Sequence, residues 1–150
     1  MQPSDADFEA RTRASFDRQP AMRTLGATLE SVAPGRVVIV MAHAEHLTQQ
    51  HGFLHAGMLS AALDSACGYA AFSLMPADAA VLTIEFKINL LAPARGPRFR
   101  IEGQVVKAGR TISVVEGRAL QHGADGGDEK LVATMNATVM TVQGREALRH

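Results

Sequence analysis

The order of hydrophobic and polar positions divides the chain into six predicted strands and one long predicted helix. Alternating or β-branched patterns, which are typical of strands, occur in six segments. These segments are residues 25–32, 36–42, 81–92, 98–107, 111–121 and 130–142. After the second of them, the run from about His55 to Met75 is apolar nearly all round and predicts a helix that ends at Pro76. A shorter helix is predicted over residues 5–18, closed by Pro20.

A helix that is apolar on all sides must be surrounded, because any open side would leave nonpolar surface in water. Only the strands can surround it, so we expect an α+β fold in which a curved antiparallel sheet wraps around one central helix. The chain has no internal repeat or long linker, and its 150 residues suffice for one domain with a core over about residues 20–142. Such a sheet keeps an exposed edge, which predicts a homodimer or a dimer of dimers.

The predicted strand over residues 81–92 is amphipathic. Its polar positions are Thr83, Glu85, Lys87 and Asn89, and its apolar positions are Ile84, Phe86, Ile88 and Leu90. Because side chains alternate across a strand, we expect Thr83 to share the polar face with Glu85.

The predicted central helix contains a single acid. Asp64 is the only residue with a full formal charge between His46 and Ala77. A carboxylate in an apolar segment loses hydration, so it needs a partner or a function. His55 lies nine residues earlier, where the helix is predicted to begin, in the sequence QQHGFLHAG. An acid in an apolar helix that starts with His-x-Gly is the best candidate for chemistry in this chain.

Composition narrows the classes of partner. The chain has 15 Lys+Arg and 15 Asp+Glu, no Trp and one Tyr. Nucleic-acid-binding proteins usually carry a basic excess and stacking aromatics, so we expect no nucleic-acid partner. Asp64 interrupts the longest apolar run, the N-terminal residues form no targeting signal, and the single Cys67 cannot form an intramolecular disulfide. We therefore expect a cytoplasmic protein with no membrane partner.

The segment from Gln49 to Gly57, followed by Asp64, resembles the motif of the PaaI-type acyl-CoA thioesterases, which have the hotdog fold. In that family a polar residue and a short loop precede His-Gly-Gly at a helix start, and an acid follows about nine positions later. The resemblance covers roughly residues 20–142, including the strand LTIEFKINLLAPA and the hairpin KAGRT. Gln49 stands where the family usually has Asn, and Ala56 replaces the first Gly of His-Gly-Gly.

The resemblance implies hydrolysis of an acyl-CoA, with a medium-chain, long-chain or aryl acyl group, to a free carboxylic acid and CoA. Asp64 would be the general base or the nucleophile, Gln49 would orient water or the thioester carbonyl, and Thr83 would hold the water or the carboxylate. The N–H groups of Ala56 and Gly57 would polarise the thioester carbonyl, because the first N–H groups of a helix have no intrahelical partners. No metal or organic cofactor is expected, since CoA is part of the substrate.

Helix geometry predicts that two chains share this site. Nine residues correspond to about 900° of rotation, half a turn out of phase, and to a rise of about 13 Å. Asp64 and His55 of one subunit therefore cannot act on the same carbonyl. The helix start of one chain must meet Asp64 of another, where His55 either fixes the loop or takes part directly. The resemblance implies the same interface site, with Thr83 beside Asp64.

Other residues are candidates for binding the substrate. We expect the acyl group to lie along the helix–sheet interface near Met58, Leu59 and Leu63. The phosphates of CoA need basic groups, and the candidates are Lys107 and Arg110 at the predicted hairpin. Arg98 and Arg100, which share a strand face, are alternatives.

Three other functions stay open at this point. A non-catalytic acyl-CoA sensor would keep the acyl slot but need no acid in the helix. A hydratase or dehydratase of the same fold usually needs an Asp and a His close together, and no His follows Asp64 until His122. A purely structural interaction domain would have no affinity for CoA. The spacing of His43, His46, His51 and His55 does not match the zinc-helix pattern, so no metal site is expected.

Overall fold

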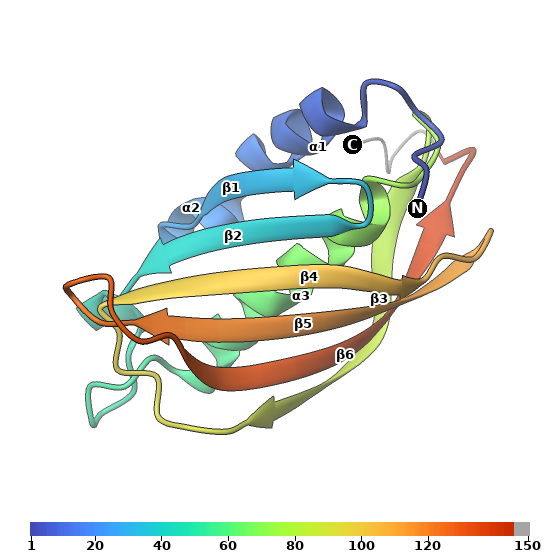
Figure 1. Cartoon of the computed structure of the whole chain (residues 1–150). Coiled ribbons are helices and arrows are strands. Elements are labelled where there is room, and N and C mark those ends of the chain that lie inside the picture. Colours follow the sequence, from blue (N-terminus) through green and yellow to red (C-terminus); the bar gives the residue numbers. More distant parts are fainter. Residues whose placement is uncertain (146–150) are drawn as a thin grey trace.

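In a computed structural model of the chain, residues 1–145 are described, and they form a curved sheet around a central helix (Figure 1). The helices are α1 (Phe8–Asp17), α2 (Pro20–Leu25) and α3 (Ala56–Phe72), with a short 3-10 turn at Glu45–Leu47. The strands are β1 (Thr28–Ala33), β2 (Arg36–Ala42), β3 (Ala80–Leu90), β4 (Arg98–Lys107), β5 (Ile112–His122) and β6 (Lys130–Val142). The expected fold class is confirmed.

The sheet has the strand order β1-β2-β4-β5-β6-β3, and all of its pairings are antiparallel. The two edges are therefore β1 and β3. The helices α1 and α2 lie beside β1, whereas β3 borders α3 and its other edge pairs with no strand of residues 1–145 (Figure 1). No helix among residues 1–145 is both long enough and apolar enough to cross a membrane.

The N-terminal helix prediction was wrong in one respect. Pro20 does not close a helix but begins α2, where its fixed φ and missing N–H suit the first helical position. Gly26, with φ of 63°, ends α2 in the left-handed conformation, so Leu25 is helical and β1 starts only at Thr28.

Two glycines let α3 lie against the middle of the sheet. A Cβ on Gly103 of β4 would be 2.2 Å from the Ala66 carbonyl oxygen, and one on Gly117 of β5 would be 2.9 Å from Cys67 Sγ. A larger residue at Gly103 would force the backbone of the helix to move, and one at Gly117 would force the side chains of Cys67 and Leu63 to shift. Burial raises the pKa of the Cys67 thiol to about 12, so Cys67 packs as a small apolar residue and is not a nucleophile.

The end of α3 is fixed by an arginine from α1. The Arg11 guanidinium donates to the carbonyl oxygens of Phe72, Met75 and Pro76 at 3.3, 2.7 and 3.1 Å. It also forms an ion pair of 2.9 Å with Asp5. These bonds attach α1 to the segment in which α3 ends, at Phe72 rather than at Met75.

A β-bulge in β3 changes the face on which Thr83 lies. Thr83 pairs with Val139, but Glu85 pairs with the next residue, Thr138, so Ile84 is the extra residue. Val139 is fully buried under α3, and Thr83 lies on this helix-facing side. The expectation that Thr83 shares a face with Glu85 was therefore wrong, because the bulge interrupts the alternation.

Candidate active site

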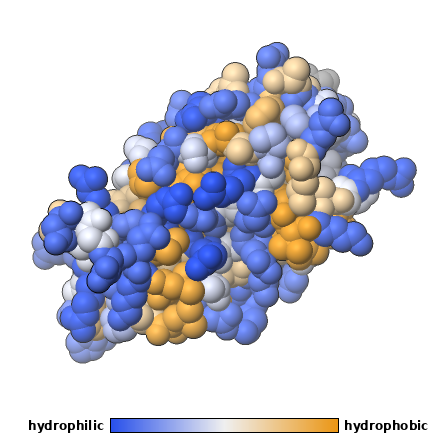
Figure 2. Space-filling view, viewed as in Figure 1, coloured by the Kyte–Doolittle hydropathy of each residue, from blue (hydrophilic) through white to orange (hydrophobic). Residues whose placement is uncertain are grey.

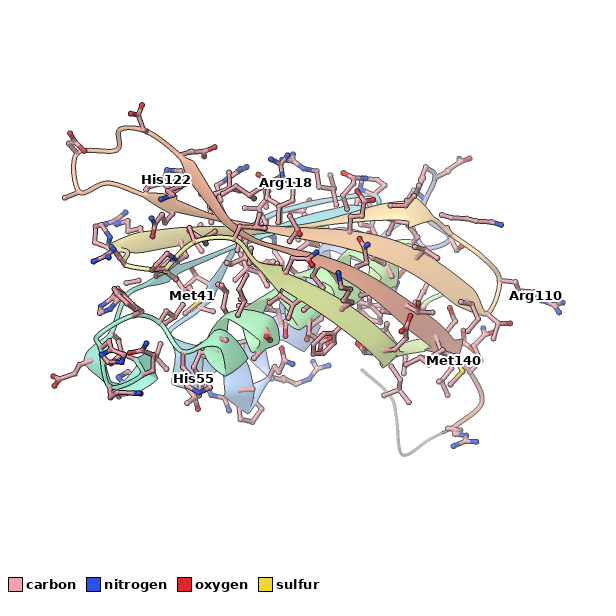
Figure 3. All side chains as sticks on the ribbon, turned by 90° about the horizontal axis from the view of Figure 1, so that it is seen from below. Met41, His55, Arg110, Arg118, His122 and Met140 are labelled. Atoms are coloured by element: carbon pink, nitrogen blue, oxygen red, sulfur yellow. The ribbon has the colours of Figure 1, made fainter. Side chains whose placement is uncertain are left out.

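The start of α3 is organised by His55, which Figure 3 shows at the beginning of the helix. His55 is the N-cap residue, with extended backbone (φ −61°, ψ 136°), and its Nδ1 accepts the Gly57 N–H at 2.8 Å. Nδ1 must be unprotonated to accept this bond. The Gly57 N–H is therefore occupied, whereas we find no bond from the Ala56 N–H to any residue of the described chain.

Gln49 belongs to the loop that leads into α3. Its side-chain oxygen accepts the His51 N–H, and its backbone N–H donates to the Phe53 carbonyl at 2.9 Å. Because the oxygen is engaged within the loop, the NH₂ group is the part of the Gln49 side chain that is free to bind a ligand.

A cavity of about 400 Å³, which we call the loop cavity, adjoins the helix start. Its lining comes from the loop, the first turn of α3 and the segment after β3. The lining residues are Gln49, Phe53, Leu54, Ala56, Leu59, Leu90, Leu91, Ala92, Pro93 and Ala94. The part after β3 could not be predicted from the sequence, because long-range contacts such as the bond from the Leu54 N–H to the Ala94 carbonyl at 2.9 Å bring it beside the loop.

The acid lies on a different part of the helix. Asp64 is half-buried, and its Oδ1 accepts a hydrogen bond of 2.7 Å from Thr83 Oγ1. The bulge at Ile84 makes this contact possible, since it turns Thr83 toward α3. An exposed hydroxyl that binds one carboxylate oxygen leaves the other oxygen free for water or substrate.

The described chain holds these groups as two separate halves. The donor half contains Gln49, His55 and Ala56, and the acid half contains Asp64 and Thr83. About 13 Å of helix separates His55 from Asp64. Neither half can act alone on a carbonyl that needs both a donor and a base.

The predicted acyl-binding residues are divided between cavity and core. Leu59 lines the loop cavity, and Met58 is half-buried beside the core. Leu63 is fully buried, with a methyl group close to Gly117, and lines none of the cavities found in residues 1–145. Leu63 therefore packs in the core of the single chain, where Gly117 of β5 leaves room for it, and its place in the acyl slot stays a prediction.

The basic candidates lie in two different places. Lys107 and Arg110 are exposed at the β4–β5 hairpin, where Arg110 lines a cavity of about 440 Å³ near the end of α3. Figure 3 shows Arg110 and His55 at opposite ends of the molecule.

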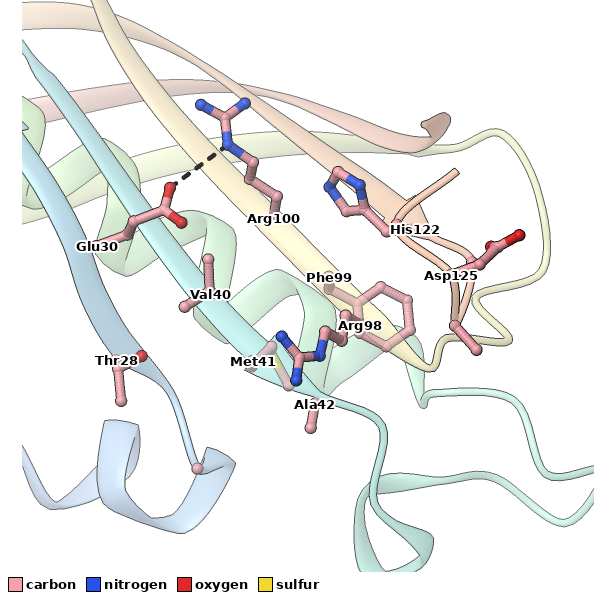
Figure 4. A pocket seen from close by; sticks show the side chains of 14 residues that line it. Thr28, Glu30, Val40, Met41, Ala42, Arg98, Phe99, Arg100, His122 and Asp125 are labelled. Atoms are coloured by element: carbon pink, nitrogen blue, oxygen red, sulfur yellow. Dashed lines mark ion pairs between the residues drawn. The ribbon is translucent and has the colours of Figure 1, made fainter. Parts of the chain in front are cut away.

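Arg98 and Arg100 line a groove of about 700 Å³ on the outer face of the sheet (Figure 4). Arg100 is engaged there with Glu30 at 3.6 Å and with Glu102. The groove crosses β1, β2, β4 and β5, away from β3 and from both halves of the site.

The unpaired edge strand β3 exposes four large apolar side chains. Leu82, Ile84, Phe86 and Leu90 are each at least 41% exposed. The outer face of the sheet differs, since Figure 2 shows it as largely hydrophilic between separate apolar patches. An apolar strand edge without a partner is the kind of surface that pairs with another strand.

The described residues contain no group of three or more His, Cys, Asp or Glu that could hold a metal ion. His43 instead binds the Gly52 carbonyl at 2.9 Å, and His46 lies 3.3 Å from the Thr24 carbonyl. Both contacts fix the loop between β2 and α3.

Comparison with known proteins finds a thioesterase family model and solved structures that share the fold. The profile described as Thioesterase superfamily matches residues 51–123. A thioesterase family protein from Silicibacter pomeroyi is 55% identical, and the match covers 89% of this chain and 97% of that one with a TM-score of 0.86. The PaaI protein of Escherichia coli shares the fold at 20% identity, with a TM-score of 0.79 over 90% of this chain and 93% of that one.

Curated relatives carry only a provisional esterase name. A Halobacterium salinarum protein is 31% identical over 75% of this chain and 78% of its own length. A Saccharolobus solfataricus protein is 40% identical over 55% of this chain, which spans only 58% of that relative.

Proposed function

Because the chain belongs to the thioesterase superfamily, we propose that it hydrolyses acyl-CoA thioesters to a carboxylic acid and free CoA, at sites shared by two copies of the chain. The observation that carries the proposal is the hydrogen bond of 2.7 Å between Asp64 and Thr83, beside a strand edge without a partner. In the proposed dimer, this carboxylate would face the helix start of the second chain.

The donor half would stabilise the negative charge that develops on the thioester oxygen. The Ala56 N–H is at the positive end of α3 and has no partner in the described chain, so it is the first donor. The Gln49 NH₂ group is the second, since its oxygen is held by the His51 N–H. The Gly57 N–H is not available to the thioester oxygen, because it already donates to His55 Nδ1.

The acid half would supply the base. Asp64 takes a proton from water while the water oxygen bonds to the thioester carbon, and Thr83 holds the carboxylate in position. The tetrahedral intermediate then collapses with cleavage of the C–S bond, and the proton held by Asp64 passes to the leaving sulfur. These groups supply the base and the donors without a metal ion or organic cofactor, so treatment with EDTA is expected to leave the rate unchanged.

The two halves would meet in a homodimer paired through β3. The apolar side chains at this edge would be covered, and α3 of each chain would bring its donor half to the partner's acid half. Lys107 and Arg110 of the chain that supplies the acid are the groups proposed for the phosphates of CoA, because Arg110 lies at the opposite end of its own chain from His55. Both side chains are exposed, and neither is in an ion pair of the described chain.

The test is release of free thiol from a panel of acyl-CoAs by the wild type and by Asp64→Asn. We expect the wild type to turn over and kcat of Asp64→Asn to fall by about 10³-fold, because the base is removed. Glu85→Gln is the control, since Glu85 is an acid of β3 two residues after Thr83 and accepts a bond from Thr138 on the other face of the sheet. Binding of CoA esters without turnover by the wild type would contradict the proposal, as would full activity of Asp64→Asn.

A further inference from the structure

The loop cavity has a lining without any formal charge. Nine of its ten residues are apolar, and Gln49 is the exception. A charged group placed against this lining would lose part of its hydration, and no side chain of the lining carries a charge that could pair with it. The volume of about 400 Å³ corresponds to on the order of ten non-hydrogen atoms, taking roughly 30 Å³ for a group the size of a water molecule.

Phe53 is the one aromatic residue in this lining, and several contacts fix its position. Its carbonyl accepts the Gln49 N–H at 2.9 Å, and the next residue, Leu54, donates to the Ala94 carbonyl at 2.9 Å. The Arg95 guanidinium lies 4.5 Å from the centre of the Phe53 ring, although Arg95 is not itself part of the cavity lining.

Arg95 is in turn anchored to the sheet. Its backbone N–H donates to Gln121 Oε1 of β5 at 2.9 Å, and the Gly96 N–H reaches the same oxygen at 3.4 Å. A cation over an aromatic face stabilises the pair by about 0.5–1 kcal/mol at an exposed site. The ring is therefore held between its own loop and a segment attached to β5.

We propose that Phe53, positioned by Arg95, is the wall that limits the length of the acyl group, and that the accepted acyl groups are uncharged and apolar. The inference depends on the proposed function, since it assigns the loop cavity to the acyl group. Ala56 and Phe53 both line the cavity, so an acyl chain bound at the Ala56 N–H would occupy the space that the Phe53 ring borders. Truncation of the ring opens the cavity to longer chains.

The experiment measures kcat/KM for saturated acyl-CoAs from acetyl to hexadecanoyl, with succinyl-CoA as the charged substrate. Wild type is expected to prefer chains of on the order of ten carbon atoms and to hydrolyse succinyl-CoA at least 100-fold less efficiently. Phe53→Ala is expected to shift the preference to longer chains, with a relative gain of at least tenfold for hexadecanoyl- over octanoyl-CoA. Arg95→Met, which keeps the aliphatic stem and removes the cation, is expected to shift it in the same direction by about threefold.

Two further variants keep the test decisive. Phe53→Leu retains an apolar wall and covers the case in which Phe53→Ala does not fold, and it is expected to give an intermediate shift. Arg118→Met removes an exposed arginine from the outer face of β5 and is expected to leave the chain-length profile unchanged. An unchanged profile in folded Phe53 and Arg95 variants, or efficient hydrolysis of succinyl-CoA, would overturn this inference alone. Absence of turnover by the wild type on every ester would overturn the proposed function and this inference with it.

Discussion

The donor half and the acid half of the site are held in place by different kinds of interaction. In the donor half, His55 binds Gly57 two residues later, and Gln49 binds His51 two residues later. In the acid half, Asp64 binds Thr83, which is 19 residues away and on another element. Local bonds place the donors wherever the helix begins, whereas the acid is oriented only when the sheet has closed around α3.

This difference implies that the two halves respond differently to mutation. Changes in the donor half act on a few backbone groups and leave the sheet intact. Changes in the acid half act through the bulge of β3, which is also the proposed dimer edge.

Ala56→Pro is expected to have the largest effect among the donor and positioning variants. Proline is favoured at the first helical position, and the extended backbone of His55 suits a residue before proline, so the helix should persist while the proposed donor N–H is removed. Loss of one such donor lowers kcat by about 10²–10³-fold. Steady-state kinetics and circular dichroism measure the two effects.

Ala56→Ser, which keeps the N–H, is the control and should retain activity. Unaltered kcat in Ala56→Pro would show that this N–H does not stabilise the transition state.

Thr83→Val is expected to have an intermediate effect. The substitution keeps the β-branched shape and removes the hydroxyl that donates to Asp64 at 2.7 Å. Loss of one hydrogen bond to a charged group costs about 1.5–3 kcal/mol, so kcat should fall by about tenfold or more with little change in KM. Thr83→Ser should restore most of the rate. Equal activity of the Val and Ser variants would mean that the hydroxyl does not position the acid.

His55→Asn is expected to have the smallest effect. Asparagine is a good N-cap, so it can replace Nδ1 as the acceptor of the Gly57 N–H. If His55 only fixes the loop, kcat of His55→Asn should stay within about threefold of wild type, and His55→Ala should lower the free energy of unfolding by about 1 kcal/mol. A loss of 100-fold or more in the Asn variant would instead assign the imidazole a direct catalytic role.

The sequence predicted the strands and the central helix because their patterns depend on neighbouring residues. β2, β4 and β6 have the bounds that were expected, and Asp64 stood out by its isolation in an apolar run. The PaaI-like spacing also brought His55, Ala56 and Gly57 to the start of α3, where the structure has them.

The features that the sequence did not predict depend on contacts between distant residues. The face of Thr83 follows from a bulge that appears only in the register of β3 with β6. Leu63 packs in the core because Gly117 has no side chain to fill the same space. The loop cavity forms because the segment after β3 lies beside the loop that contains Phe53. The capture of the Gly57 N–H by His55 is local, and the His-x-Gly spacing could have suggested it.

A purified mixed dimer of two inactive variants tests the shared site most directly. One chain carries Ala56→Pro and the other Asp64→Asn, with different affinity tags so that only the mixed dimer is isolated. If each site takes its donor from one chain and its acid from the other, one of the two sites in the mixed dimer contains neither substitution. The account predicts about half of the wild-type activity from this dimer while both parent homodimers stay inactive. A mixed dimer as inactive as its parents would contradict it.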